Sequence, residues 1–510
     1  MRFLVWIAFC VILISCQNEQ KNQSSQLGTI DIDVTVNEDA RAVFEEALLL
    51  LHSFEYKDAA EKFRTAQELD PECAMAIWGE AMCENHPLWR EQNLNNAREI
   101  ISKLGDDPET RRTKFKTEFE QDMYDAMAVL YGSGSKNERD QAYALKMEEL
   151  HGKYPDNHEI TSFYALSLLG AVKGGRDFEA YAKGAKIAES VIKENPNHPG
   201  ALHYLIHSYD DPDNAHKALE AANSYSKVAP DAGHALHMPS HIYVALGMWD
   251  EVISSNIASW NASVKRKEKK ELDNDALNYH AFKWQMYGHL QKAEYDKARA
   301  LVEDMQGYCY EKPSARSVSH LVMMKAPYFI ETGNWADSLF NDTIDYTQYP
   351  FYTRAVHEYL TGMRSFHLES SSDLTVSIDS LSGLINRHTN AALLGTGSMC
   401  SGVYSREAPT TLDIERSKVL LMELEVLKAL SEGNDLLAEA KLKEAVQQEQ
   451  NTSYNYGPPE IVKPSSEMYA EFLFERKRFD EAKEQLELVL DRAPGRYITS
   501  TMLGKLKEKA

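Results

Sequence analysis

Apolar side chains recur at the three- and four-residue spacing of amphipathic helices from Asn37 to Arg496, and the strict alternation typical of strands is nearly absent. The helices follow one another in pairs, and several pairs recur at an interval of 34 residues, as Pro196 and Pro230 do. A helical pair of this length cannot bury its apolar face alone, so successive pairs must stack on one another. The pattern predicts an all-α solenoid of roughly ten helical hairpins.

The residue types within the repeat indicate which kind of repeat it is. With Ala40 as position 1, an aromatic residue, an alanine, an aromatic residue, an alanine and a proline occupy positions 17, 20, 24, 27 and 32: Tyr56, Ala59, Phe63, Ala66 and Pro71. This unit resembles the tetratricopeptide repeat (TPR), and so do the units that start at Pro199 and Gly233. The resemblance implies a right-handed superhelix in which positions 2, 5, 9, 12 and 13 of each first helix face a concave groove.

Other parts of the chain match the repeat less completely. Further units are marked by Tyr295 with Ala298, Gly333 with Trp335, Gly433 with Ala438, and Phe479 with Ala482, Leu486 and Pro494. Residues 87–157 and 341–413 have helix-period patterns without a clean register. We expect one elongated solenoid over residues 37–510.

The first residues have the layout of a bacterial lipoprotein signal. Arg2 precedes an apolar run from Phe3 to Ile14, which is too short to span a bilayer as a helix. The run ends in Leu-Ile-Ser-Cys, which resembles a lipobox with Cys16 as the lipidated residue; the alternative is an ordinary signal with an incidental cysteine. We expect a signal peptide over 1–15, a flexible polar tether over 16–36, and a lipid anchor in the cell envelope, with Gln17 favouring the outer membrane facing the periplasm.

The charge of the chain limits its partners. The formal net charge is −23, which argues against binding nucleic acid or an anionic membrane surface. We therefore expect a membrane association through the N-terminal lipid only, and a protein or peptide as the partner. Beyond the signal and Cys16 only four cysteines remain, too few for a disulfide scaffold: Cys73, Cys83, Cys309 and Cys400.

Histidines carry the chemical signal of this sequence. Seven of the 17 histidines fall between His198 and His241. Positions 5 and 9 are histidine in two consecutive units, which places four imidazoles on neighbouring first helices: His203, His207, His237 and His241. Helices packed about 8–10 Å apart could bring these four rings to one point. Imidazole suits zinc, copper and iron, so the pattern favours a transition-metal site.

Several residues around these four were expected to complete the groove. His234 and His280 occupy position 2 of their units and are candidates for further ligands. Asp210 and Asp211 occupy positions 12 and 13 of the unit that starts at Pro199, where they could be ligands or carboxylates that fix a ring tautomer. A groove that binds a peptide or small ligand without metal, and a purely structural histidine network, remain as alternatives.

Two further groups of residues are weaker candidates for the site. His52 and His86 both fall at position 13 of their units, and Trp78 and Met82 were expected to line the same groove as His86. Near the C-terminus, Glu467 at position 5, with Glu471 at position 9, is a weak candidate for a catalytic base or ligand facing the histidines across the channel. A solvated acidic helix face is the alternative for these two glutamates.

Four segments together resemble one family of bacterial TPR proteins: DPECAMAIWGEAM, NHPGALHYLIHSYDDP, HALHMPSHIYVALGMWDEVISSN and the ending from Tyr456 to Arg496. The resemblance implies a fold and an envelope location, and it implies no particular reaction. No nucleophile elbow, phosphate loop or H-E-x-x-H motif occurs. Three functions follow as hypotheses: an envelope scaffold that binds a ligand in its groove, a metal-dependent enzyme or metal-binding protein, and a structural assembly lipoprotein.

Overall fold

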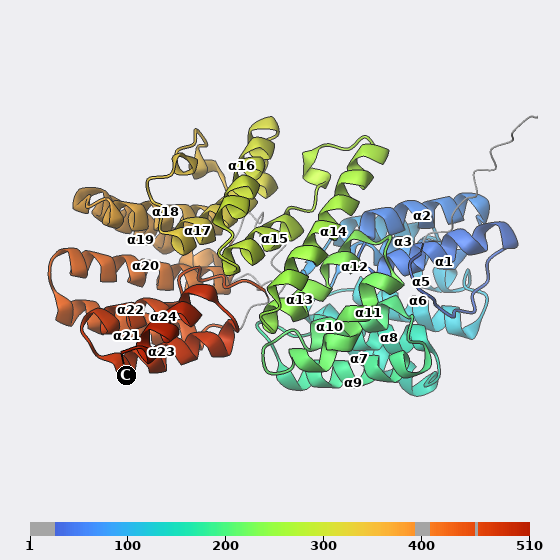
Figure 1. Cartoon of the computed structure of the whole chain (residues 1–510). Coiled ribbons are helices and arrows are strands. Elements are labelled where there is room, and N and C mark those ends of the chain that lie inside the picture. Colours follow the sequence, from blue (N-terminus) through green and yellow to red (C-terminus); the bar gives the residue numbers. More distant parts are fainter. Residues whose placement is uncertain (1–25, 393–408, 454–456, 510) are drawn as a thin grey trace, which may run out of the picture.

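The computed structural model describes residues 26–392, 409–453 and 457–509, and in these residues the chain is almost entirely helical. The signal peptide, Cys16 and the first part of the expected tether lie outside the described residues. Helices follow one another as antiparallel pairs that stack along the chain from the blue N-terminal end to the red C-terminal end (Figure 1). The all-α, TPR-like solenoid expected from the sequence is confirmed.

The first half of the solenoid contains fourteen α-helices and one short strand pair. The helices are α1 (Glu38–His52), α2 (Tyr56–Leu69), α3 (Ala74–Met82), α4 (Leu94–Ser102), α5 (Pro108–Arg112), α6 (Glu118–Leu130), α7 (Lys136–Lys153), α8 (His158–Gly170), α9 (Phe178–Glu194), α10 (Pro199–Ser208), α11 (Leu219–Val228), α12 (Gly233–His237), α13 (Pro239–Ala245) and α14 (Trp249–Lys269). The antiparallel strands are β1 (Asn85–His86) and β2 (Glu91–Gln92), and the 3₁₀ turns are η1 (Ala215–Ala218) and η2 (Asn274–Ala276).

The second half continues with the same kind of hairpin. Its helices are α15 (Tyr279–Gln291), α16 (Tyr295–Glu311), α17 (Ala315–Thr332), α18 (Phe351–His367), α19 (Ser371–Ala392), α20 (Thr411–Ser431), α21 (Asp435–Asn451), α22 (Ser465–Glu475), α23 (Phe479–Arg492) and α24 (Tyr497–Lys507). Two 3₁₀ turns, η3 (Ser338–Phe340) and η4 (Tyr346–Gln348), follow α17. None of the described helices has the length and apolarity needed to cross a membrane.

The helix pairs correspond to the hairpins expected from the sequence. Within the described residues the paired, mutually contacting helices are α1/α2, α3/α4, α6/α7, α8/α9, α10/α11, α12–α13/α14, α15/α16, α18/α19, α20/α21 and α22/α23. First helices also contact the first helices of neighbouring pairs, as α10 does with α8 and α13, and α15 with α17. The first helices therefore form a continuous inner layer, and this layer positions the histidines.

The unit marked by Gly333 and Trp335 departs from the repeat. Helix α17 ends at Thr332 and Gly333 adopts a left-handed φ of +63°, but η3 and η4 take the place of the expected second helix. Carboxylates of Asp337, Asp342 and Asp345 accept hydrogen bonds from backbone N–H groups two residues further on. Such short-range bonds compete with helix formation, which explains the irregular segment.

Part of the expected tether belongs to the folded chain. Residues 26–36 have no regular secondary structure and pack against the solenoid, where Leu27, Ile32 and Val34 are buried. The Thr29 N–H donates to the Asn197 carbonyl at 2.9 Å. Apolar side chains at these positions give the segment a reason to pack, so residues 26–36 belong to the folded part.

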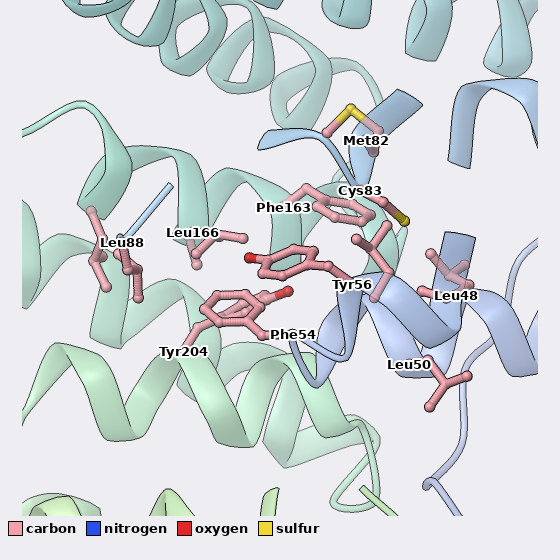
Figure 2. Packing of buried hydrophobic residues seen from close by; sticks show 14 of the residues in the cluster. Leu48, Leu50, Phe54, Tyr56, Met82, Cys83, Leu88, Phe163, Leu166 and Tyr204 are labelled. Atoms are coloured by element: carbon pink, nitrogen blue, oxygen red, sulfur yellow. The ribbon is translucent and has the colours of Figure 1, made fainter. Parts of the chain in front are cut away.

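Buried apolar side chains form two clusters, one from Leu27 to Val252 together with Trp284, and one from Leu277 to Leu506. Figure 2 shows part of the first cluster, where Phe54, Tyr56, Phe163 and Tyr204 from three distant parts of the chain point toward one another. Phe54 has a positive φ of 57° in the turn between α1 and α2, which directs its ring into this cluster. The cluster forms the floor of the histidine site.

The C-terminal end of the chain is tied to the middle of the solenoid by a buried ion network. Arg496, just before α24, pairs with Glu467 of α22 at 2.7 Å and with Glu331 of α17 at 2.5 Å, and its guanidinium donates to the Tyr287 hydroxyl of α15 at 3.2 Å. The Trp249 indole N–H donates to the Gly495 carbonyl at 3.1 Å. Side chains from three helices, α15, α17 and α22, therefore meet at one arginine.

We predict that Arg496→Met destabilises the protein by about 3–5 kcal/mol, because it leaves two buried carboxylates without their shared cation. Urea denaturation followed by tryptophan fluorescence measures the loss. Arg478→Met is the matched control, since Arg478 pairs with Glu439 and Glu481 near the surface, where ion pairs contribute little. Equal destabilisation by both substitutions would contradict the proposed importance of the network.

Candidate functional site: two histidine triads on the inner layer

The histidines lie on consecutive first helices of the solenoid. His203 and His207 belong to α10, His234 and His237 to α12, and His241 to α13. Helices α12 and α13 are one first helix interrupted at Met238, because the proline that follows lacks the N–H that would continue the hydrogen-bond ladder. His280 belongs to α15, the first helix of the next unit.

The first triad is His203, His207 and His234. The Nε2 atom of His203 lies 3.1 Å from Nε2 of His207 and 3.2 Å from Nε2 of His234. Each residue offers one ring nitrogen, and the three nitrogens lie within 4.8 Å of one another. His203 and His207 are buried, whereas His234 is partly exposed.

The second triad is His237, His241 and His280, whose ring nitrogens also lie within 4.8 Å of one another. The ring centroids of His237 and His280 are 4.6 Å apart, and those of His237 and His241 are 5.1 Å apart. As in the first triad, two members are buried and the third, His280, is partly exposed.

The expectation that His203, His207, His237 and His241 meet at one point is therefore corrected. Each pair at positions 5 and 9 is completed by the histidine at position 2 of the following unit, His234 or His280. Successive first helices are offset along the solenoid, which brings position 2 of one helix beside positions 5 and 9 of the helix before it. The same three-residue arrangement thus occurs twice, one repeat apart.

A hydrogen bond on the far side of its ring orients His203 in the first triad. Nδ1 of His203 lies 2.8 Å from the backbone carbonyl of His52. A carbonyl oxygen only accepts, so Nδ1 carries the proton and Nε2 presents its lone pair to His207 and His234. Second-sphere contacts of this kind fix the tautomer of metal-ligating histidines.

The second triad has equivalent supports. Nδ1 of His237 donates to Oδ1 of Asn256 at 2.6 Å, and the amide of Asn256 is itself oriented because its NH₂ group donates to the Val252 carbonyl at 2.7 Å. Nδ1 of His241 donates to Oδ2 of Asp210 at 2.5 Å. His237 therefore presents an unprotonated Nε2, which is buried with no hydrogen-bond partner among the described residues.

Burial keeps these imidazoles neutral. Burial lowers the pKa of His203 to about 3, and together with the neighbouring rings it holds the pKa values of His207, His234, His237 and His280 well below the usual range. At neutral pH these rings carry a lone pair rather than a second proton. Neutral imidazole is the form that binds a metal ion.

Arg176 holds the turn that carries the two aspartates. Its guanidinium pairs with Asp211 at 2.8 Å, donates to the Ser208 carbonyl, and lies over the ring of Tyr181 at 4.3 Å. Asp211 is thus occupied by Arg176, whereas Asp210 is directed at His241. Of the two expected carboxylates, Asp210 supports a ring and Asp211 stabilises the turn.

Aromatic residues and a distant loop enclose the site. The ring of Phe54 lies 4.3 Å from that of His203, and Trp284 lies 4.5 Å from His241 and 5.0 Å from His237 between ring centroids. Gly457, in the loop before α22, packs so tightly on Trp284 that an added Cβ atom would lie 2.1 Å from the indole. The C-terminal repeats therefore cover the site with their own backbone.

A third group of potential ligands, His52, Glu159 and His198, is a closed hydrogen-bond network instead. Glu159 accepts from Nε2 of His52 at 2.6 Å and from Nε2 of His198 at 3.1 Å. The remaining nitrogens are also engaged, because Nδ1 of His52 bonds the Tyr204 hydroxyl and Nδ1 of His198 accepts the Ala201 N–H. All four ring nitrogens are used, so this group serves as the support behind His203.

The other expected groove residues do not join the triads. Trp78 is buried in the apolar core and Met82 lines a small cavity of about 30 Å³ with residues of that core. The helix expected to carry His86 ends at Met82, and His86 instead forms part of β1, where its ring stacks on Tyr56 at 4.0 Å. The residue before a proline disfavours the helical conformation, and His86 precedes Pro87.

Glu467 is neither a solvated residue nor a free base. It is completely buried and bound by Arg496, by Lys463 at 3.2 Å and by the Thr499 hydroxyl at 2.6 Å. Burial alone would raise its pKa, but the charges of Arg496 and Lys463 hold the pKa well below the usual range. A carboxylate this well paired is a poor general base, so its place is in the C-terminal ion network.

Sequence reasoning missed most of the supporting residues. The sequence marks His52 only by its repeat position, and it gives no local indication of Asn256, Arg176 or Phe54. The carbonyl of His52 reaches a ring 151 residues further along the chain, a contact with no local signal. Trp284 has a local signal, because it lies four residues after His280 on the same helix face.

Fold and site together define an all-α, TPR-like solenoid with two adjoining histidine triads inside it. Comparison with known proteins adds little beyond the fold: no family model and no curated protein matches the chain. Among solved structures, Cut9–Hcn1 from the APC/C hetero-tetramer is 11% identical and covers 93% of this chain and 77% of its own, with a TM-score of 0.39.

Two further solved structures are similar at the same level. Yeast Tom70 is 14% identical over 93% of this chain and 90% of its own, with a TM-score of 0.32, and the P58(IPK) TPR domain is 11% identical over 92% and 98%, with a TM-score of 0.22. At these identities the likeness concerns the architecture alone. Solenoids of this kind present extended concave surfaces and commonly serve as protein-interaction scaffolds.

The tautomers and charges of the triads can be tested in metal-free protein labelled with ¹⁵N-histidine. We predict that His203 and His237 show Nδ1-protonated neutral rings and keep them as the pH falls from about 8 to about 5, because a lowered pKa delays protonation until the pH is below this range. Two-bond ¹H–¹⁵N spectra report the tautomer, and His203→Gln and His237→Gln assign the signals. A shift to the imidazolium pattern near pH 6 would refute the predicted burial.

Proposed function

We propose that this protein is a transition-metal-binding solenoid that is anchored to the bacterial cell envelope through Cys16. The observation that carries the proposal is the repeated triad in which three ring nitrogens converge, with contacts behind His203, His237 and His241 that orient these rings. The donor set consists of imidazoles, which suit zinc, copper and iron.

The spacing of the nitrogens supports this proposal. Metal–nitrogen bonds of about 2.0–2.1 Å in a tetrahedral site separate the ligand nitrogens by about 3.3 Å. In the first triad the distances from His203 Nε2 to the other two Nε2 atoms are 3.1 and 3.2 Å. The rings are therefore close to the arrangement that an ion requires, and small rotations complete it.

Three protein ligands per ion favour a site that binds or transforms something over a purely structural one. Structural zinc sites use four protein ligands, whereas reactive sites use three and leave a position open. His234 and His280 are the partly exposed members of the triads, so solvent reaches the site on their side.

The two other hypotheses explain less of the structure. A long peptide in the central groove would compete with the chain's own loop, since Gly457 packs on Trp284 and the Arg176 N–H donates to the Ser453 hydroxyl at 3.1 Å. A structural assembly lipoprotein has no need for buried, neutral imidazoles. Protein partners remain suited to other faces of the solenoid, as its architecture suggests.

Metal binding can be measured on residues 17–510 produced without a histidine tag. After dialysis against zinc or copper, elemental analysis should find bound metal in near-integral ratio to protein, and the melting temperature should rise because the ion binds the folded state. The double variant His203→Gln/His237→Gln should lose the metal. Folded wild-type protein that binds neither ion, with an unchanged melting temperature, would sink the proposal.

A matched second-sphere variant refines that test. Asn256→Leu removes the acceptor behind His237 without touching a ligand, and loss of such a partner lowers metal affinity about 10- to 100-fold. Competition with a chelator measures the change. His158→Gln, a histidine at the start of α8 that pairs with Glu194 rather than with either triad, should leave the affinity unaltered.

The lipid anchor rests on the lipobox-like sequence before Cys16 and is tested separately. In a bacterial host that processes lipoproteins, the full-length chain should incorporate labelled fatty acid and fractionate with membranes. Cys16→Ser should abolish the labelling and leave the unprocessed precursor. Labelling that persists in this variant would refute Cys16 as the lipidated residue.

A further inference from the structure

We propose that the two triads form one dinuclear copper centre that binds dioxygen between its two ions. This inference rests on the proposed metal-binding function and specifies its metal, its nuclearity and its small-molecule ligand. It follows from the contact between the triads, from their all-imidazole ligands, and from the size of the molecule that can reach the bound ions.

The triads adjoin each other without an intervening side chain. The rings of His207 and His241 are 5.7 Å apart between centroids, and those of His234 and His237 are 6.1 Å apart. Within the triads the corresponding distances run from 4.6 Å, for His237 and His280, to 6.4 Å, for His241 and His280. Separations across the boundary thus match those within a triad, which places two ions as neighbours in one space.

The charge balance favours ions of low charge. The donor set consists of six imidazoles, a ligand type that binds metal without adding charge, and the Asp210 carboxylate lies behind His241. Asp211 is balanced by Arg176, and the positive charge of Lys283 acts on His237. The cost of burying charge grows steeply with its magnitude, so two divalent ions would be much less favourable here than two monovalent ones.

Copper meets this requirement better than zinc or iron. Copper(I) is monovalent and binds imidazole, whereas sites built for manganese or iron pairs take carboxylate ligands, which neither triad provides. Three nitrogens around each copper(I) leave a coordination position for an additional ligand.

The surroundings limit that ligand to a very small molecule. Phe54 and Trp284 pack on the rings, and the Gly457 backbone lies directly on Trp284. His234 and His280 are the partly exposed members of the triads, so the approach lies on their side. We infer that dioxygen is small enough to enter there, and that the aromatic walls would shield the bound product from water.

The proposed step balances without other groups. Each of two copper(I) ions gives one electron and becomes copper(II), and dioxygen accepts both electrons and becomes a peroxide dianion bridging the ions. The O–O double bond is reduced to a single bond, and no proton is transferred. Release of dioxygen reverses the step, because the peroxide returns one electron to each ion and both become copper(I) again.

The test uses metal-free protein loaded with copper(I) under anaerobic conditions and then exposed to air. We expect two coppers per chain, a peroxide-to-copper charge-transfer band in the near ultraviolet, and almost no electron paramagnetic resonance signal, because the two copper(II) spins are coupled. These readouts need no substitution, so they do not depend on any variant folding.

Two matched variants separate the halves of the centre. His234→Gln removes one ligand of the first triad and His280→Gln one of the second, and both positions are partly exposed, so the substitutions disturb packing little. Each variant should retain about one copper, lose the near-ultraviolet band, and after oxidation give the signal of an isolated copper(II). His158→Gln should behave as the wild type.

The possible failures are distinguishable. Absence of bound copper and zinc in folded protein overturns the proposed function and this inference together. Two coppers that give a full, uncoupled copper(II) signal and no charge-transfer band leave metal binding standing and overturn the dinuclear centre. Wild-type protein that binds only one copper, and keeps that one copper in both single variants, also contradicts it.

Discussion

The structure depends on one constraint, which is that a buried imidazole must stay neutral and must have a partner for its ring N–H. Water cannot supply that partner inside the solenoid, so the protein does, through the His52 carbonyl, the Asn256 amide and the Asp210 carboxylate. Once Nδ1 is engaged behind the ring, the lone pair on Nε2 necessarily faces inward. The requirement of folding thereby creates the donor atoms of the site.

The repeat then determines how many of these donors meet. A single unit provides two histidines one helical turn apart, and the next unit provides the third, so no hairpin contains a complete triad. Two consecutive units with histidine at positions 5 and 9 yield two triads side by side. The pattern stops after that, because α15 has Lys283 and Tyr287 where the earlier first helices have histidine. The paired site is thus a direct product of the repeat.

The sequence predicted the fold and the four central histidines because both rest on local periodicity, which a repeat register makes visible. It assigned those four to one point, since nothing local gives the offset between successive helices. The residues that support the rings could not be predicted from the sequence, because Arg176, Asn256 and the His52 carbonyl meet their partners through tertiary packing. Leu27 and Val34 are another example. Their polar neighbours in the sequence suggest a tether, but tertiary packing buries both side chains.

The C-terminal repeats connect the stability of the fold with the closure of the site. Arg496 joins α17 and α22 and reaches Tyr287 on α15, the helix that also carries His280 and Trp284. The loop before α22 lies on Trp284, whose ring covers His237 and His241. Loosening the ion network would therefore free α15 and its covering loop at the same time. Glu467, which its repeat position suggested as a base, is therefore linked to the histidines only indirectly, through Arg496 and the helices that this network joins.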